Sequence, residues 1–108
     1  MVLLYLAKGK YSMNRVSLYN GYLPTTHKGL MEIINNFDYS NYSPLIFLGG
    51  NDTNFYSLGL EIKKQFTNYL QVTDSATGHD LAIDSATTYQ NTIDYYTNPL
   101  PNTQSVIP

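Results

Sequence analysis

The sequence has no cysteine, no tryptophan, only two histidines and few charged residues, which make up 13% of its 108 positions. The lack of cysteine excludes disulfides, thiolate metal sites and cysteine nucleophiles. Two histidines also exclude a histidine-rich metal site. Six Lys or Arg against eight Asp or Glu leave a net charge of −2, which offers no basic surface to nucleic acid. We therefore expect no metal, no cofactor and no nucleic-acid partner.

Long apolar runs are absent as well. The apolar opening from Val2 to Ala7 is far shorter than the roughly 20 residues that span a bilayer. It also lacks the basic start and the long apolar core of a signal peptide. We expect no membrane span, and a cytoplasmic location is favoured. The length predicts one small domain.

What the sequence does contain is an alternation of short apolar runs and segments with helical periodicity. This alternation predicts an α/β fold, a partial three-stranded parallel sheet with flanking helices. The predicted strands span Arg15 to Tyr19, Pro44 to Leu48 and Tyr69 to Thr73, and the second is expected to be buried on both faces. Three prolines after Asn98 predict a mobile tail without regular structure over 98–108, following a domain that spans 1–97.

Helices are predicted between and around these strands. Three segments carry apolar stripes at helical spacing: Leu30, Ile33, Ile34 and Phe37; Leu58, Ile62, Phe66 and Tyr69; Ala86, Tyr89, Ile93 and Tyr96. Their expected N-caps are Thr25 or Thr26, Ser57, and Asp84 or Ser85, respectively. The segment from Met1 to Lys8 is apolar on nearly every side, which predicts a helix buried between other elements.

Two ionisable residues stand beside glycine directly after predicted strands. Asp52 follows Gly49-Gly50-Asn51 after the second strand, and His79 follows Gly78 after the third. Alone, an Asp in the position of Asp52 is more often part of an ordinary turn, and a lone loop His such as His79 is usually only solvated. As a pair they are more informative, because 27 residues separate them, enough for one loop, one helix and one strand. We therefore expect both at the carboxyl edge of adjacent parallel strands, where the carboxylate can orient the imidazole.

His27 serves as a comparison for this pair. It lies near a predicted helix start and has no acidic partner at a strand end, so it is assigned no role.

The same residues resemble the C-terminal part of an α/β-hydrolase. PLIFLGGND (44–52) resembles the seventh strand and acid turn of that family, and TDSATGHDL (73–81) resembles the loop of its catalytic histidine. VSLYNGYLP (16–24) is similar to the sixth strand and the SGYLP-like continuation of the carboxylesterase and acyl-protein thioesterase branch, with Asn20 where Ser is commoner. MVLLYLAK (1–8) resembles the helix after the nucleophile elbow. The resemblance implies that Asp52 is the orienting acid and His79 the general base of a serine hydrolase.

The resemblance lacks the nucleophile. The family carries its serine in Gly-x-Ser-x-Gly, and no serine of this chain lies in that motif. The resemblance implies that the serine precedes the first residue, so the chain alone is expected to be inactive. It is then the C-terminal portion of a longer ester or thioester hydrolase, one half of a split enzyme, or a remnant kept for binding. The first is preferred, and a non-enzymatic interaction or structural subunit is the alternative.

The resemblance also bears on partners. With the serine segment in place, the substrate class is a small-molecule ester or thioester. Without it, the strand from Arg15 to Tyr19 exposes a sheet edge, and exposed edges pair or aggregate. We expect a homo-oligomer or a complementary N-terminal segment at that edge. An unrelated small α/β domain stays open as a third reading if Asp52 and His79 lie far apart.

Overall fold

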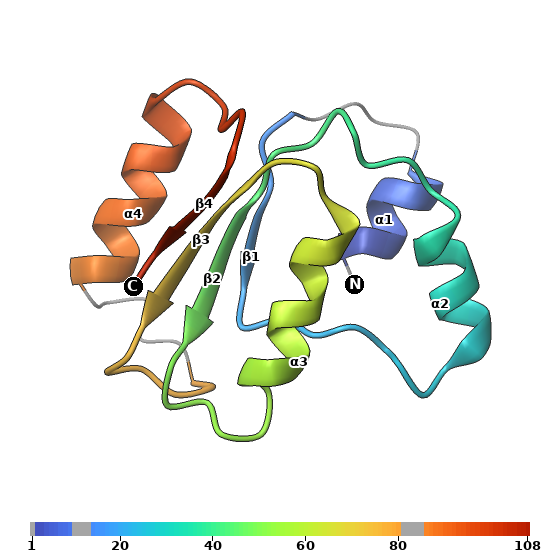
Figure 1. Cartoon of the computed structure of the whole chain (residues 1–108), viewed down its shortest axis with the longest axis horizontal. Helices are drawn as coiled ribbons and strands as arrows, with labels where there is room; N and C mark the ends of the chain where they lie inside the picture. Colours follow the sequence, from blue (N-terminus) through green and yellow to red (C-terminus); the bar gives the residue numbers. More distant parts are fainter. Residues whose placement is uncertain (1, 10–13, 81–85) are drawn as a thin grey trace.

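The computed structural model describes residues 2–9, 14–80 and 86–108. The chain forms one four-stranded parallel sheet with strand order β1-β2-β3-β4 (Figure 1). The strands are β1 (Ser17–Tyr19), β2 (Leu45–Gly49), β3 (Tyr69–Asp74) and β4 (Gln104–Ile107). The predicted α/β class is confirmed, with four strands in place of three.

Helices cover both faces of this sheet. They are α1 (Val2–Lys8), α2 (Lys28–Asn35), α3 (Tyr56–Leu60), which continues into the 3₁₀ helix η1 (Glu61–Gln65), and α4 (Ala86–Thr97). One core cluster joins α1, α2 and η1 to Leu18, Ile46 and Leu48 of the sheet. A second joins Tyr95 of α4 to Leu45, Phe47 and Val72. Because alternate residues of a strand point to opposite faces, α4 covers the face that the other helices leave free.

Strand β2 is the centre of the packing. All five of its residues are buried, as predicted from its unbroken apolar run. Its neighbours pair with it in parallel, Leu18 opposite Ile46 on one side and Val72 opposite Phe47 on the other. Burying each such side chain contributes about 1.5–3 kcal/mol, so this strand fixes the sheet from which the loops at its carboxyl edge project.

The prediction of no regular structure after Asn98 is wrong for Gln104–Ile107, which pairs in parallel with β3. The prolines at 99, 101 and 108 flank this strand and do not interrupt it. All four strand residues therefore keep the backbone N–H that a sheet ladder needs. Prolines therefore indicate where a strand ends, but they do not exclude a strand in the segment between them.

The helix boundaries also differ from the predictions. The N-cap of α2 is His27, whose Nδ1 accepts a hydrogen bond from the Leu30 N–H at 3.2 Å, and not Thr25 or Thr26. The imidazole nitrogen accepts the hydrogen bond that a side-chain hydroxyl or carboxylate usually accepts at an N-cap. His27, which was assigned no role from the sequence, therefore stabilises the start of α2. Phe55, not Ser57, precedes α3 as its N-cap residue. The predicted caps Asp84 and Ser85 lie outside the described residues.

The apolar stripes are placed less regularly than helical periodicity predicts. Ile62 of η1 and Phe66 directly after it lie in the first core cluster. Leu58 of α3 is only half-buried, and Tyr69 already belongs to β3. On α4, Tyr89, Ile93 and Tyr96 are exposed. The buried residues of that helix are Thr88 and Tyr95, so the stripe expected to face the core faces outward.

Helix α1 is only half covered, in contrast to the prediction of a helix buried between other elements. Leu3 and Leu6 are buried, while Val2 and Tyr5 are exposed. The helix contacts α2, and its residues Val2 and Leu3 line a hollow together with β1. Among the described helices, none is both long and apolar enough to cross a membrane.

Candidate functional site

Asp52 lies in the turn that leads from β2 to α3. Its backbone N–H donates to the Gly49 carbonyl at 3.1 Å, and its carbonyl accepts from the N–H groups of Phe55 and Tyr56 at 3.3 and 2.9 Å. The turn thus holds the Asp52 backbone from both sides, and only 4% of the residue is exposed. Burying a carboxylate is costly unless it is paired, so the position depends on a partner for the side chain.

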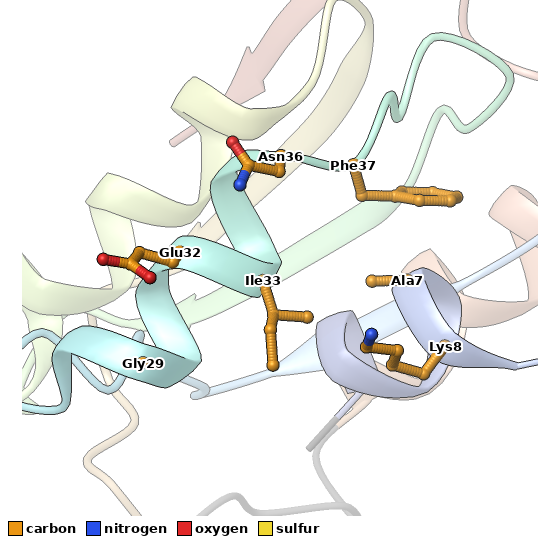
Figure 2. A pocket seen from close by; sticks show the side chains of 7 residues that line it. All are labelled: Ala7, Lys8, Gly29, Glu32, Ile33, Asn36 and Phe37. Carbon is orange, nitrogen blue, oxygen red and sulfur yellow. The ribbon is translucent and has the colours of Figure 1, made fainter.

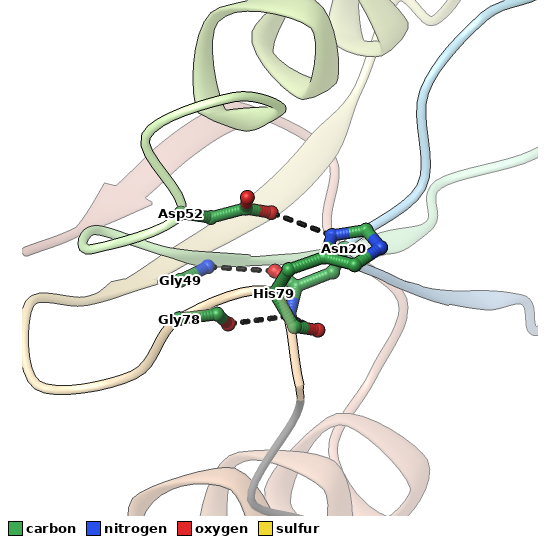
Figure 3. Close-up of polar contacts among 5 residues, drawn as sticks. All are labelled: Asn20, Gly49, Asp52, Gly78 and His79. Carbon is green, nitrogen blue, oxygen red and sulfur yellow. Dashed lines mark hydrogen bonds and ion pairs between the residues drawn. The ribbon is translucent and has the colours of Figure 1, made fainter.

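That partner is His79, in the loop after β3. The Nδ1 atom of His79 lies 2.8 Å from Oδ2 of Asp52 (Figure 3). The carboxylate can only accept, so Nδ1 donates and the neutral ring carries its lone pair on Nε2. The His79 side chain is 46% exposed, and within the described part of the chain no side chain is hydrogen-bonded to Nε2. The ring can therefore take up a proton from an incoming group while Asp52 holds its other nitrogen.

The structure thus brings together the two residues that the sequence placed on adjacent strands. The interpretation as an unrelated small α/β domain required Asp52 and His79 to lie far apart, and they are in contact.

Glycine lets the turn that carries Asp52 lie directly against the loop that carries His79. A Cβ atom on Gly49 would stand 2.5 Å from the Gly78 carbonyl oxygen and 2.6 Å from that of Thr77. The approach is closed by backbone hydrogen bonds from Gly50 to Asp74 at 2.7 Å and from Asn51 to Thr77 at 2.9 Å. The Gly-Gly pair is therefore required because the two backbone segments approach each other closely. This requirement for glycine is stricter than that of an ordinary turn.

Asn20 ties the end of β1 to the same two segments. Its Oδ1 accepts from the Gly49 N–H at 2.7 Å, and its Nδ2 donates to the carbonyls of Gly78 and His79, both at 3.1 Å (Figure 3). Asn20 is buried and has a positive φ of 50°, a conformation that asparagine tolerates better than most residues. Three strand ends are thereby held by one side chain.

From the sequence alone, Asn20 was singled out as a departure from the serine that is commoner in the hydrolase pattern, and no role was predicted for its side chain. Its position in an Asn-Gly pair after a strand is a signal for a left-handed turn residue, but no local pattern predicts bonds to a loop 58 residues later. Phe55 was also missed. Its ring lies against the imidazole of His79, with ring centroids 4.4 Å apart, and nothing near Phe55 in the sequence indicates this contact.

An apolar hollow of about 390 Å³ lies along the free edge of β1. It is lined by side chains of α1, β1, the loop after β1 and η1, among them Val2, Leu18, Tyr22 and Ile62, and by no charged residue. Strand β1 pairs only with β2 in the described sheet, so the hollow lies beside unpaired backbone groups.

A second hollow, of about 350 Å³, lies between α1 and α2 (Figure 2). Ala7, Ile33 and Phe37 contribute apolar surface, while Lys8 and Glu32 bring one charge of each sign. Neither Asp52 nor His79 lines this hollow, so it has no connection with the paired residues.

No group of three or more His, Asp or Glu within residues 2–9, 14–80 and 86–108 could hold a metal ion. The fold and the site together define a small α/β domain that carries a His–Asp pair at the carboxyl edge of neighbouring parallel strands. No protein-family model, no curated protein and no solved structure matches the chain.

Proposed function

We propose that this chain is the C-terminal portion of a serine ester or thioester hydrolase of the α/β-hydrolase kind, in which Asp52 is the orienting acid and His79 the general base. The observation that carries the proposal is the 2.8 Å contact between Nδ1 of His79 and Oδ2 of Asp52. A buried acid that fixes one nitrogen of a half-exposed imidazole is the arrangement that general-base catalysis by histidine requires.

In this proposal the nucleophile is a serine outside the present sequence. Nε2 of His79 takes the proton as the serine oxygen attacks the carbonyl carbon, and Asp52 stabilises the imidazolium. Nε2 then gives the proton to the leaving alcohol or thiol, and water cleaves the acyl-enzyme by the same route. The donors that stabilise the oxyanion also lie outside the sequence, so the chain alone does not turn over an ester.

The free edge of β1 supports the same proposal. An edge strand with an apolar, uncharged hollow beside it fits an apolar strand from a complementary N-terminal segment, which would pair with β1 and cover α1. The segment that brings the serine is the occupant that this proposal requires. Without it, a second copy of the chain satisfies the same backbone groups.

The test has two parts. The coding sequence upstream of Met1 is read for Gly-x-Ser-x-Gly in frame, and the protein that includes it is assayed with short-chain ester and thioester substrates. Asp52→Asn is expected to lower kcat by about 10⁴-fold and His79→Ala by about 10⁶-fold, because each removes a member of the proton-transfer unit. His27→Ala is the matched control, since it removes the other histidine, and is expected to keep full turnover.

Two outcomes contradict the proposal: an in-frame stop codon with no serine motif upstream, or turnover that His79→Ala and Asp52→Asn leave unchanged.

The uncharged hollow beside β1 also favours a second candidate, a non-enzymatic interaction subunit that uses this edge to bind a partner. In that case His79→Ala and Asp52→Asn leave partner binding unchanged, and no ester is hydrolysed by any product of the gene.

A further inference from the structure

The imidazole of His79 is held by a second contact besides Asp52. Its ring lies against Phe55, with centroids 4.4 Å apart and an interplanar angle of 35°. The ring of Phe55 is in turn stacked with that of Tyr22, at 4.6 Å and 23°. Phe55 therefore lies in a row of three rings, with His79 at one end.

The position of Phe55 follows from the turn that carries Asp52. Phe55 comes three residues after the acid, and its N–H donates to the Asp52 carbonyl at 3.3 Å. One short turn thus supplies both contacts to His79: the carboxylate at Nδ1 and an aromatic ring against one side of the imidazole. Tyr22, from the loop after β1, contacts Phe55 and is itself 45% exposed.

The hydrogen bond alone does not fix the direction of Nε2. The torsion that turns a histidine ring about its bond to Cβ has a broad minimum, and His79 lies in a loop and is 46% exposed. A ring held at Nδ1 can still tilt about that contact. An aromatic ring against one side of the imidazole restricts this tilt, because tilting towards Phe55 brings the two rings into overlap.

We propose that Phe55 is a positioning residue for His79, supported by Tyr22, and that it sets the direction in which Nε2 points. The role of this direction rests on the proposed function, in which Nε2 is the proton acceptor. The positioning itself is a property of the present chain and is measured without any nucleophile.

The two histidines provide an internal comparison for the measurement. Nδ1 of His27 accepts from the Leu30 N–H, so the neutral His27 ring carries its proton on Nε2. Nδ1 of His79 donates to Asp52, so the neutral His79 ring carries its proton on Nδ1. The tautomers differ, and ¹⁵N-resolved NMR of the two imidazoles distinguishes them.

The experiment records the imidazole carbon-bound protons and ring nitrogens of the whole chain above neutral pH. In the wild type, the His79 ring protons are expected to be displaced by the ring current of Phe55 relative to those of His27, with the Nδ1–H tautomer predominant. Phe55→Leu is expected to abolish the displacement and to replace the single set of nuclear Overhauser contacts of the His79 ring protons by an averaged one, because the ring then tilts. The Nδ1–H tautomer, which Asp52 fixes, and the His27 signals are expected to stay unchanged. Phe55→Tyr keeps an aromatic ring and restores both signals.

Phe37→Leu is the matched control, because it removes an aromatic ring that lies just after α2 and contacts Tyr39. It is expected to leave the His79 signals unchanged. The inference is overturned if the wild-type His79 ring protons show no ring-current displacement, a result that requires no variant to fold. It is also overturned if folded Phe55→Leu keeps the wild-type His79 signals.

These outcomes are separate from those of the proposed function. A displaced, single-tautomer His79 in a protein whose ester turnover ignores His79→Ala supports the positioning and contradicts the hydrolase. A His79 ring without displacement, in a protein whose turnover requires it, does the reverse.

Discussion

Asn20 shows how one side chain can organise three strand ends. Its amide accepts from the Gly49 N–H and donates to two carbonyls of the His79 loop, and its own N–H donates to the Phe47 carbonyl at 2.9 Å. Serine at this position has a shorter side chain with one donor hydrogen and cannot make the same set of bonds. The departure from the serine that is commoner in the hydrolase pattern therefore has a structural consequence.

Two substitutions separate the hydrogen bonds of Asn20 from its backbone conformation. Asn20→Gly tolerates the positive φ and removes the side-chain bonds, so we expect the free energy of unfolding to fall by about 1–3 kcal/mol. Asn20→Ala adds the cost of a positive φ for a residue with a Cβ, about 1–2 kcal/mol more. Urea unfolding measures both.

Asn54→Ala, at an exposed position before α3, is the control and is expected to change stability by less than about 0.5 kcal/mol. Equal stability of Asn20→Gly and wild type would mean that the amide bonds contribute nothing.

Gly49 allows a second residue-level prediction. Gly49→Ala places a Cβ 2.5 Å from the Gly78 carbonyl oxygen, so the acid turn and the histidine loop must separate. We expect a loss of about 1–3 kcal/mol or more in urea unfolding, together with disruption of the His79 tautomer signal by NMR.

Gly21→Ala is the matched control, since its Cβ would meet only Ile62 Cδ1 at 3.6 Å, an ordinary contact. If both alanine variants are equally stable, the tight approach at Gly49 is not required.

The residues that could be predicted from the sequence are those whose position follows from topology. Asp52 and His79 were predicted to meet because both follow strands, and parallel neighbours end at the same edge of a sheet. Asn20 and Phe55 could not be predicted in the same way. Their roles depend on contacts of individual side chains across loops, and no periodicity encodes these contacts.

At the scale of elements, α4 shows why an apolar stripe can mislead. Tyr95 is the buried tyrosine of this helix, and its hydroxyl donates to the Ser43 carbonyl at 2.8 Å and accepts from the Val16 N–H at 3.2 Å. Both backbone groups are buried and lie just before strands. Arg15 also donates to the carbonyls of Tyr95 and Asn98 at the end of α4. These polar contacts, together with the packing of Tyr95, orient the helix, whereas periodicity counted Tyr89, Ile93 and Tyr96 as its core side.

The burial of Tyr95 predicts a pH dependence of stability. Burial raises the pKa of Tyr95, and burial likewise raises the pKa of Tyr39. Below the unfolded pKa of about 10 both states hold the phenolic proton, so the native state keeps its full stability. As the pH rises above that value, the unfolded state loses the proton first and stability falls, by at most about 1.4 kcal/mol per pH unit for each group.

Urea midpoints from about pH 8 to pH 11 test this. Tyr95→Phe is expected to be less stable at neutral pH by about 1–3 kcal/mol, because Val16 N–H and the Ser43 carbonyl lose their partner. Its further loss above pH 10 is expected to be smaller than that of the wild type. Tyr89→Phe, at an exposed tyrosine of the same helix, is the control and should retain the wild-type profile. A wild-type stability that stays constant through this range would contradict the prediction.

At the scale of the whole molecule, the two edges of the sheet differ in what surrounds them. Strand β1 lies beside the uncharged apolar hollow, with Val2 exposed on α1 and Tyr96 exposed on α4, where its hydroxyl contacts Ser17. Strand β4, at the other edge, exposes Val106 and Ile107. Backbone groups at both edges can pair with another strand, and the β1 edge offers an apolar surface from α1, β1 and η1 for a partner to cover.

Two matched lysine substitutions test which edge associates. A lysine in place of Val2 puts a charge on the wall of the hollow, and one in place of Ile107 puts the same charge on the other edge strand. Burying an unpaired charge in an apolar interface is unfavourable. We therefore expect Val2→Lys to weaken self-association about tenfold or more, which corresponds to about 1.4 kcal/mol, and Ile107→Lys to leave it within about threefold. Sedimentation velocity over a range of concentrations measures both.

A wild-type chain that stays monomeric at micromolar concentration, or an association that Ile107→Lys weakens and Val2→Lys does not, contradicts self-association through β1. The first result leaves the edge to a segment other than a second copy, and the second moves the interface to β4.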